Sequence, residues 1–258
     1  MKPARSDTPY HIESLARGLD VLALFSREQP TVLLTDVVKR TGLNKATAYR
    51  ILSTLEATGY LERDPDTRRY RPGLKVLQLG FAALHSLDIR QIAHPHLEQL
   101  AHEQDLTGSL GVLDGVQVVY VDRIRNREIV GLLLGPGDRI PAHCSSMGKV
   151  MLAHLTHTEL KKTLETAELK PRTVNSITSV EDLITEIGRI RNDGYALNDE
   201  ELASGLRAVA APIFDSDGHC CAAINVSGSS DMISRERLRH ELPERVINTA
   251  KQISHALG

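Results

Sequence analysis

The feature that most constrains this chain is a glycine turn between two helical patterns, with a charged hairpin directly behind them. Apolar residues at helical spacing predict a first helix over 11–25. A second helix is expected to start at Thr35, whose hydroxyl suits an N-cap, and to end at Gly42. Asn44 then caps a third helix over 45–58. Helix, short glycine turn and helix together form the helix-turn-helix pattern.

The third helix has two chemically different faces. Its apolar face, expected in the core, carries Ala48, Ile51, Leu52 and Leu55. The opposite face is small and polar, and it carries Ala46, Tyr49, Arg50, Ser53 and Ala57, flanked by Thr47 and Thr54. Such a surface fits the major groove of DNA, where Arg50 can reach a guanine edge or a phosphate and Ala46 a thymine methyl. The alternative is an amphipathic helix whose polar face meets only water.

A predicted hairpin follows this helix, with strands over 60–63 and 68–71 around a turn at 64–67. Arg68 and Arg69 at its tip suit phosphate or minor-groove contacts, although a solvated charged hairpin is the alternative. A hairpin directly after a helix-turn-helix is a wing, and the three parts together predict a DNA-binding segment. Its candidate DNA contacts are Thr35, Asn44, Lys45, Ala46, Thr47, Tyr49, Arg50, Ser53, Arg68 and Arg69.

Charge is distributed unevenly along the chain, although the net charge is only −2. Residues 1–86 contain 13 Lys and Arg against 9 Asp and Glu, whereas the remainder contains 18 against 24. A basic N-terminal part on an acidic body is typical of a protein whose N-terminal part meets phosphates.

Composition indicates a globular protein of the cytoplasm, with 41% hydrophobic and 25% charged residues. No apolar run is long enough to cross a bilayer, and residues 1–10 lack the apolar core of a signal peptide. Cys144, Cys220 and Cys221 are odd in number and form no C-x-x-C pair, which fits a reducing compartment better than a disulfide scaffold or a zinc site.

Residues 74–87 form an apolar helical pattern between the two parts of the chain. A helix this apolar needs a partner, so it is a candidate dimer surface; packing against its own body is the alternative. Asp88 is expected to cap the next helix, which runs to about Gln104, with Pro95 marking a kink or a new first turn. The expected boundaries are 10–73 for the DNA-binding domain, 74–87 for the linker helix and 88–258 for the body.

The body alternates strand and helix patterns. Strands are expected over 108–113, 117–124, 128–134, 206–214 and 220–226, and helices over 146–155, 158–165, 180–192 and from 234 onward. Consecutive hairpins, the first around Asp114-Gly115, predict an antiparallel sheet flanked by helices and hence an α+β body.

The string from Gly135 to Lys149 is the most specific candidate site in the body. It leads into a helix whose first turn, Ser-Ser-Met-Gly, offers backbone amides and two hydroxyls to a carboxylate. An ordinary Ser-capped helix is the alternative. Asn225 and Ser227 face one side of a strand together, and the polar run 198–201 precedes another strand; each suits either a ligand or an internal structural contact.

Three patterns that resemble catalytic or metal sites are incomplete. Ser146 and Lys149 have the S-x-x-K spacing of serine acyl-enzymes, but the accompanying S-D-N and K-T-G motifs are missing. The histidines at 94, 96 and 102 lack a metal-binding pattern, and the turn 215–218 lacks the closing Glu of a calcium loop. We therefore expect no enzyme activity, no metal and no cofactor.

The chain resembles the IclR family of bacterial regulators over almost its whole length. The resemblance rests on the segments 14–22, 41–52, 59–61 and 70–73 in the first part, and on 137–143, 148–149, 198–201 and 205–207 in the body. It implies a winged helix-turn-helix, a linker helix that pairs subunits and a GAF-like effector-binding domain with an antiparallel sheet. It also implies a homodimer or homotetramer on a palindromic operator in double-stranded DNA.

The resemblance further implies a pocket in the body. The candidate effector-binding residues are Ile129, Leu132, Leu134, Ile140, Ser145, Ser146, Met147, Gly148, Asn198, Ala208, Asn225 and Ser227. The segment 144–149, combined with Gly205-Leu206-Arg207, is similar to the Pca and Pob branch, which responds to aromatic acids such as protocatechuate and p-hydroxybenzoate. Asn198, Ala208 and Asn225 depart from the Asp, Cys and Ser of members that bind small keto acids. We expect an aromatic carboxylate with its anion at Ser145–Gly148, and a small aliphatic keto acid as the alternative effector.

Overall fold

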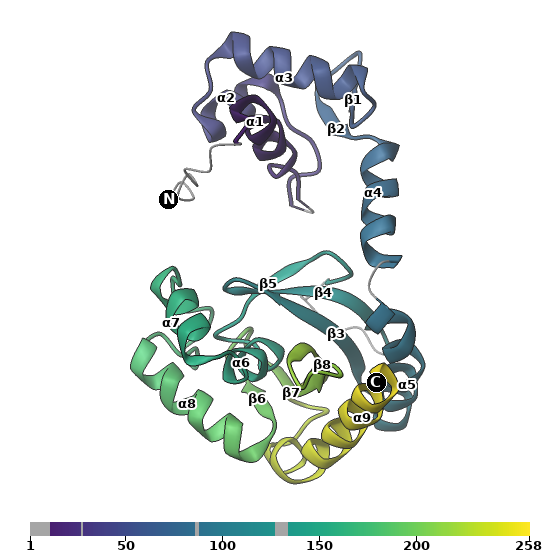
Figure 1. The fold of residues 1–258 in the computed structure, drawn as a ribbon, viewed down its shortest axis with the longest axis vertical. Coiled ribbons are helices and arrows are strands. Elements are labelled where there is room, and N and C mark those ends of the chain that lie inside the picture. Colours follow the sequence, from purple (N-terminus) through teal and green to yellow (C-terminus); the bar gives the residue numbers. More distant parts are fainter. Residues whose placement is uncertain (1–10, 27, 86–87, 127–133) are drawn as a thin grey trace. The chain divides into compact units, whose positions relative to one another are not determined.

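The computed structural model describes residues 11–26, 28–85, 88–126 and 134–258. The chain divides into two compact units, residues 1–86 and 87–258 (Figure 1). Within the described ranges, no helix is both long and apolar enough to span a membrane. The fold is α+β, as the sequence predicts.

The N-terminal unit is a small helical bundle with a two-stranded wing. Its elements are α1 (Glu13–Leu22), α2 (Leu34–Thr41), α3 (Lys45–Ala57), β1 (Leu61–Arg63), β2 (Tyr70–Pro72) and α4 (Leu74–His85). The core shared by these elements consists of Val21, Val32, Val37, Ala48, Leu52, Leu61 and Tyr70. An isolated bridge between Val32 and Tyr70 ties the segment before α2 to the wing. Burial of these apolar side chains stabilises the arrangement of α2 and α3.

The helix caps confirm one prediction and correct another. Asn44 caps α3, and its side chain accepts a hydrogen bond of 2.8 Å from the amide of Thr47. Thr35 is not the cap of α2, because that helix starts at Leu34 with Leu33 as its N-cap. The carboxylate of Asp36 accepts from the amide of Leu33 at 2.8 Å, so Asp36 supplies the capping interaction expected of Thr35.

The wing is shorter than predicted on its second side. Its strands pair Leu61 with Pro72 and Arg63 with Tyr70, so β2 begins two residues after Arg68. The carboxylate of Asp64 holds the turn, because it accepts from the amides of Asp66 and Thr67 and from the Thr67 hydroxyl. These hydrogen bonds lower the pKa of Asp64.

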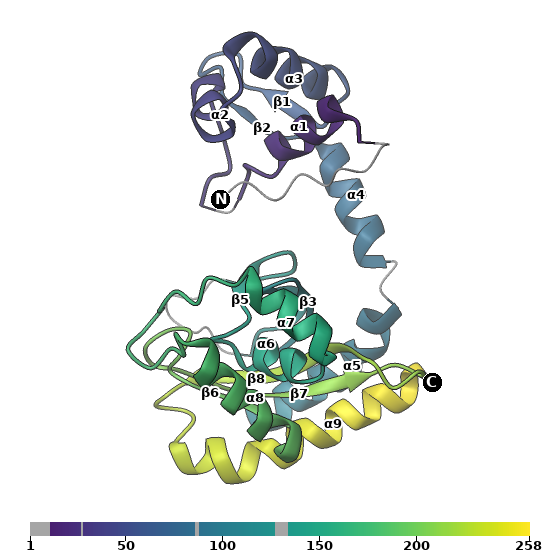
Figure 2. The same ribbon diagram turned by 60° about the vertical axis from the view of Figure 1, so that its left-hand side comes forward.

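The C-terminal unit is built on a six-stranded antiparallel sheet of order β5-β4-β3-β8-β7-β6. Its strands are β3 (Thr107–Asp114), β4 (Gln117–Ile124), β5 (Arg139–Pro141), β6 (Ala196–Asp199), β7 (Leu206–Phe214) and β8 (Cys220–Ser229). Helices α5 (Asp88–Gln104) and α9 (Leu242–Leu257) cover one face, and α6 (Ser146–Ala153) covers the other (Figures 1 and 2). Helices α7 (His157–Glu165) and α8 (Val180–Asp193) lie on the α6 side.

Several predicted elements of this unit need correction. Strands β5 and β6 were not predicted, because each is only three or four residues long. Pro95 neither ends nor restarts α5, which runs through it. The C-terminal helical segment includes a π-helical turn, Arg237–Glu241, before α9. Most of the predicted strand over 128–134 lies outside the described residues, and Leu134 is not in a strand.

Candidate DNA-contacting surface and effector site

The exposed face of α3 is the one that the sequence predicts. Ala48 and Leu52 are buried, whereas Lys45, Ala46, Tyr49 and Arg50 are exposed. Thr47 and Ser53, also predicted DNA contacts, are partly buried, and Asn44 is exposed at the cap. Within the described part of the chain, Lys45 and Arg50 form no ion pair, so both cations are available to phosphates or bases.

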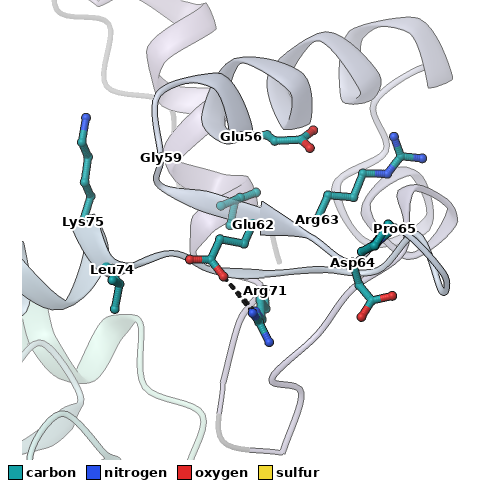
Figure 3. Close-up of a pocket in the computed structure, with 10 residues that line it drawn as sticks. Glu56, Gly59, Glu62, Arg63, Asp64, Pro65, Arg71, Leu74 and Lys75 are labelled. Carbon is teal, nitrogen blue, oxygen red and sulfur yellow. Dashed lines mark hydrogen bonds and ion pairs between the residues drawn. The ribbon is translucent and has the colours of Figure 1, made fainter.

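The wing places its arginines in different environments. Arg71 is paired with Glu62 at 2.9 Å beside the shallow hollow drawn in Figure 3. Arg69 donates to the Thr31 hydroxyl at 3.3 Å. Arg68 is exposed, with a left-handed backbone φ of 57°. The wing therefore presents Arg68 and Arg69 at its tip, as predicted, and holds Arg71 in an exposed ion pair with Glu62.

In the body, the strand register brings the predicted effector residues of three strands together. Asn198 pairs with Ala208, Ala208 pairs with Ser227, and Asn225 pairs with Ala210 two positions along β7. Ala210 and Ala223 belong to the core cluster that contains Met147 and Val150 of α6. Since side chains two residues apart share a face, Asn198, Ala208, Asn225 and Ser227 all lie on the α6 face of the sheet.

The start of α6 lies over this face and is completely buried. Ser145 caps the helix, and its hydroxyl accepts from the amide of Gly148 at 3.1 Å. Ser146 and Met147 are 1% and 0% exposed, so the first turn faces the sheet rather than solvent. Leu134 and Ile140 pack against the same cluster. Ile129 and Leu132 lie outside the described residues.

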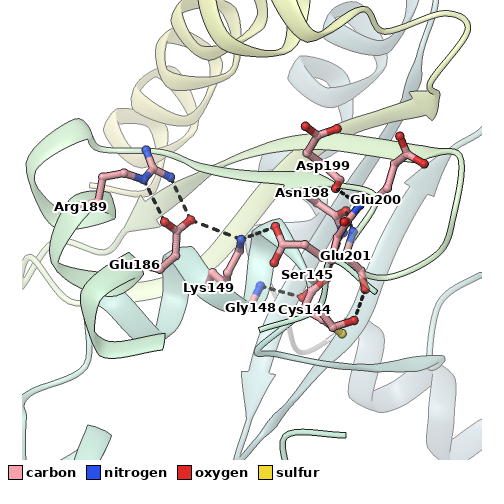
Figure 4. A network of polar contacts seen from close by, with 12 residues as sticks. Cys144, Ser145, Gly148, Lys149, Glu186, Arg189, Asn198, Asp199, Glu200 and Glu201 are labelled. Carbon is pink, nitrogen blue, oxygen red and sulfur yellow. Dashed lines mark hydrogen bonds and ion pairs between the residues drawn. The ribbon is translucent and has the colours of Figure 1, made fainter. Parts of the chain in front are cut away.

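Asn198 is already used by the fold. Its amide donates to the carbonyl of Cys144 at 3.0 Å, and its side-chain oxygen accepts from the amide of Glu201 at 3.0 Å. These contacts tie the end of β6 to the segment before α6 (Figure 4). Asn198 could therefore contact a ligand only while it keeps these two structural hydrogen bonds.

Within the described residues, four buried side-chain polar atoms of β3, β4, β8 and the start of α6 have no hydrogen-bond partner: Ser109 Oγ, Arg123 Nε, Ser146 Oγ and Asn225 Oδ1. Among the described residues the only other such side-chain atoms belong to Arg90 and Glu201. Arg123 pairs with Ser109, and Ser109 pairs with Asn225, so three of the four atoms come from direct neighbours on three successive strands. Buried polar groups usually find partners, and this concentration of unpartnered ones indicates a ligand site.

Sequence reasoning identified Ser146 and Asn225 but missed Ser109 and Arg123. A β-bulge between Leu110 and Gly111 shifts the register of the hairpin, and this shift places Arg123 opposite Ser109. Without it, Asp122 would face α6 and Arg123 would face α5. Instead Asp122 lies under α5, where its carboxylate contacts His94 at 2.5 Å and Arg90 at 3.7 Å. No sequence signal marks this bulge.

Lys149, which has S-x-x-K spacing from Ser146, is a fully buried structural cation. Its Nζ lies 2.6 Å from a Glu201 oxygen and 3.3 Å from a Glu186 oxygen, and Glu186 also pairs with Arg189 (Figure 4). Burial raises the pKa of Glu201 against the opposing effect of Lys149. The hydroxyl of Ser146 contacts no base, so the geometry does not assemble the acyl-enzyme pair.

The remaining groups that could react or bind a metal are the three cysteines, the turn from Asp215 to His219, and His143, and each has a structural explanation. All three cysteines are free thiols, and burial raises the pKa of Cys144 to about 11 and that of Cys220 to about 12, so both stay protonated. Asp215, Asp217 and His219 cluster in an exposed turn, where an oxygen of Asp215 accepts from the amides of the other two. Burial lowers the pKa of His143, which keeps it neutral beside the carbonyl of Lys170.

Comparison with known proteins agrees with this architecture. Residues 14–65 match the model of the IclR helix-turn-helix domain, and residues 81–255 match that of the bacterial transcriptional regulator IclR C-terminal domain. The HTH-type transcriptional regulator XynR of Escherichia coli (strain K12) is 32% identical over 96% of this chain and 98% of its own length. The Pca regulon regulatory protein of Pseudomonas putida is 32% identical over 96% of this chain and 85% of its own.

A solved structure extends the comparison to a relative with a bound ligand. It is an IclR homolog from Microbacterium hydrocarbonoxydans, crystallised in complex with 4-hydroxybenzoate. It superimposes with a TM-score of 0.79 and 26% identity, and the match covers 95% of this chain and 98% of that one.

Proposed function

The chain belongs to the IclR family of bacterial transcriptional regulators, and we propose that it is a dimeric or tetrameric operator-binding protein whose effector is a small organic acid, in the first place an aromatic one. A DNA-binding helix-turn-helix and an effector-binding domain make it a ligand-responsive regulator. The operator, the effector class and the assembly are the parts proposed.

The proposed DNA contacts are the exposed face of α3 and the tip of the wing. Lys45 and Arg50 are exposed cations that form no ion pair with any residue the structure describes, and Arg68 and Arg69 extend the basic surface to the turn of the wing. A helix in the major groove and a wing along the backbone would combine base reading with phosphate contacts. Two copies of this surface would read a palindromic site.

The observation that carries the effector proposal is the group of unpartnered polar atoms under α6. Hydroxyl, amide and guanidinium groups there are buried by apolar neighbours and lack internal partners, as expected of a site completed by a polar ligand. An aromatic acid supplies both an anionic group and an apolar ring. The 4-hydroxybenzoate complex of the Microbacterium homolog supports this class, and a small aliphatic keto acid is the alternative within the same family.

Effector binding would regulate operator binding only if the acid prefers one conformation of the protein. A ligand shifts a conformational equilibrium by no more than its difference in affinity for the two states. The body helix α6 meets both the polar face of the sheet and, through Lys149, the α8 helix, so a ligand at its start can act on the packing of this unit.

A thermal-shift panel tests the proposal. The purified protein is heated with 4-hydroxybenzoate, protocatechuate, benzoate, pyruvate or glyoxylate, each at increasing concentration. A ligand that binds only the folded state raises the Tm as its concentration increases. At a ligand concentration of 100 times the Kd, the free energy of unfolding increases by about 2.7 kcal/mol. We expect the aromatic acids to raise the Tm at lower concentration than the keto acids. The opposite order would favour the keto-acid alternative, and no shift with any acid would refute acid sensing.

A further inference from the structure

We propose that Arg123 of β4, with Ser109 of β3, forms the carboxylate-binding end of the effector site, and that the start of α6 holds the uncharged end of the same ligand. This inference rests on the proposed acid-sensing function and makes it more specific. It also reverses the orientation expected from the sequence, which placed the anion at Ser145–Gly148.

Arg123 is a cation that the fold does not neutralise. Within the described residues its guanidinium forms no ion pair, and its Nε atom is buried without a hydrogen-bond partner. It contacts Tyr120, with 5.5 Å between the guanidinium carbon and the ring centroid, and a side-chain hydrogen bond to Tyr120 acts on its pKa. Burial lowers the pKa of Arg123, and Tyr120 and, after it, the carboxylate of Asp138 act in the opposite direction. A guanidinium remains protonated in proteins, so its charge persists without a partner.

A buried arginine in the same unit, Arg207, shows how the protein satisfies an arginine that has a structural role. Arg207 donates to Asp199 at 2.7 Å, to the carbonyl of Ile233 at 2.8 Å and to Glu200 at 3.3 Å. Its charge and its donors are therefore satisfied by the protein itself. Among the described residues Arg123 has no carboxylate within ion-pair distance and contacts Tyr120 instead, and a largely buried charge without an acidic partner is costly unless a ligand supplies one.

The neighbours of Arg123 match a carboxylate. Ser109 lies directly opposite Arg123, and its buried hydroxyl has no partner. Asn225 lies opposite Ser109 on the next strand, so Arg123 and Asn225 are separated by about 10 Å, two strand spacings. The planar fork of an arginine binds a carboxylate through two donors, and an adjacent serine hydroxyl can donate to the same anion.

The other end of the ligand is better suited to an uncharged polar group. Ser145 already occupies one amide of the α6 start, and the carboxylates of Glu201 and Glu186 lie one turn further along, on Lys149. Ser146 Oγ and Asn225 Oδ1 are unpartnered there, and together they can donate to and accept from a hydroxyl. A ligand with a carboxylate at one end and a hydroxyl at the other would satisfy all four orphaned atoms.

The test compares 4-hydroxybenzoate with its neutral analogue 4-hydroxybenzamide, using calorimetry on the full-length protein. The variants are Arg123→Gln, Arg123→Lys and Ser146→Ala, with Arg139→Gln as the control for loss of an arginine, because Arg139 is exposed and pairs only at the surface. We expect Arg123→Gln to weaken binding of the acid about 10- to 100-fold, the effect of one hydrogen-bonded charge, and to leave the amide within about threefold. Arg123→Lys keeps the charge, so its affinity for the acid should lie between those of the wild type and Arg123→Gln.

The outcomes separate this inference from the proposed function. Suppose that the wild type binds 4-hydroxybenzoate. If Arg123→Gln then weakens binding of the acid and of the amide equally, or leaves binding of both unchanged, Arg123 is not the carboxylate site. If Ser146→Ala, rather than Arg123→Gln, abolishes the preference for the acid, the anion lies at α6. If the wild type binds no acid of the thermal-shift panel, the proposed function is refuted and this subsite with it. Cooperative thermal unfolding of each variant checks that it is folded.

Discussion

Asp122 and Arg123 are adjacent in the sequence, yet their side chains lie on opposite faces of the same sheet. One extra residue in β4, opposite the Leu110–Gly111 step of β3, turns the aspartate to the α5 face of the sheet and the arginine to the α6 face. Sequence alternation would have given the reverse assignment, because a period of two is exact only while the register is unbroken. Residues whose role depends on a local register shift are therefore the ones that a single sequence does not reveal.

Residues whose role depends on their own helix were predicted well. The polar face of α3 follows from the helical period alone, and Asn44 at the cap is a local hydrogen-bond pattern. Thr35 was assigned wrongly because two acceptors, its hydroxyl and the Asp36 carboxylate, compete for the same helix start. The four unpartnered polar atoms required the strand pairing, which the sequence does not contain.

Arg50 provides the prediction at the residue scale. It is exposed on α3 and has no ion pair within the described residues, so replacing it should remove a DNA contact without disturbing the core. If the side chain reads a base, we expect Arg50→Ala to weaken operator binding by about 1–3 kcal/mol. If it contacts a phosphate instead, we expect the slope of log affinity against log salt concentration to become shallower by about 1. Fluorescence anisotropy at several salt concentrations measures both.

The matched control for Arg50 is Arg139→Ala, which removes the same charge from the C-terminal unit. Arg139 is exposed and pairs with Asp114 at 2.5 Å, so its loss should change neither affinity nor salt slope. Arg50 also lines a groove between α1 and α3, so the oligomeric state of the variant must be measured as well. Unchanged operator affinity and salt dependence would show that α3 is not the recognition helix.

At the scale of elements, α6 is the helix on which the site depends, and a glycine fixes its position. A Cβ placed on Gly148 would lie 2.3 Å from both the Cα and the carbonyl oxygen of Ala142. The obstructing atoms are backbone atoms, which cannot rotate away. Only glycine therefore lets the first turn of α6 approach the segment after β5 this closely.

Gly148→Ala should destabilise the C-terminal unit, because the helix must shift to admit one methyl group. The expected loss is about 1–3 kcal/mol, the usual cost of overpacking a core. Gly188 in α8 is the control, since it is exposed and a Cβ there meets nothing within 4 Å. Gly188→Ala should stabilise the protein by up to about 1 kcal/mol through helix propensity alone.

Urea unfolding followed by circular dichroism measures the two glycine variants. Because the chain has two units, the transition of the C-terminal unit should be identified by its response to a bound acid. Equal effects of the two substitutions would mean that Gly148 matters only as a helical glycine. A stable Gly148→Ala variant with weakened acid binding would show instead that α6 can shift and that its position sets the affinity.

At the scale of the whole molecule, the N-terminal unit has apolar side chains that its own fold leaves exposed. The exposed fractions are 59% for Leu15, 57% for Leu19 and 63% for Leu79. Leu15 and Leu19 lie one helical turn apart on α1, and with Leu79 of α4 they line a groove of about 900 Å³. The apolar pattern of 74–87 predicted one side of this surface, whereas the contribution of α1 emerged only from its packing.

We propose that the part of this groove formed by Leu15, Leu19 and Leu79 contacts a second subunit, because an exposed apolar surface of this kind normally meets another protein surface. The double variant Leu15→Glu and Leu19→Glu should therefore lower the oligomeric state in light scattering. Its affinity for a palindromic operator should fall by at least about tenfold, since two linked half-site contacts bind far more tightly than one. Its affinity for a single half-site should change little.

Val174→Glu is the control for adding charge at an exposed apolar residue, because Val174 is 101% exposed and lies in the C-terminal unit, outside the groove lined by Leu15 and Leu19. It should alter neither the mass nor the operator affinity. If the Leu15 and Leu19 variant keeps the wild-type mass, subunits associate through another surface. If it becomes monomeric but binds the palindrome as tightly as before, association of the subunits does not contribute to operator affinity, and the two half-sites are read independently.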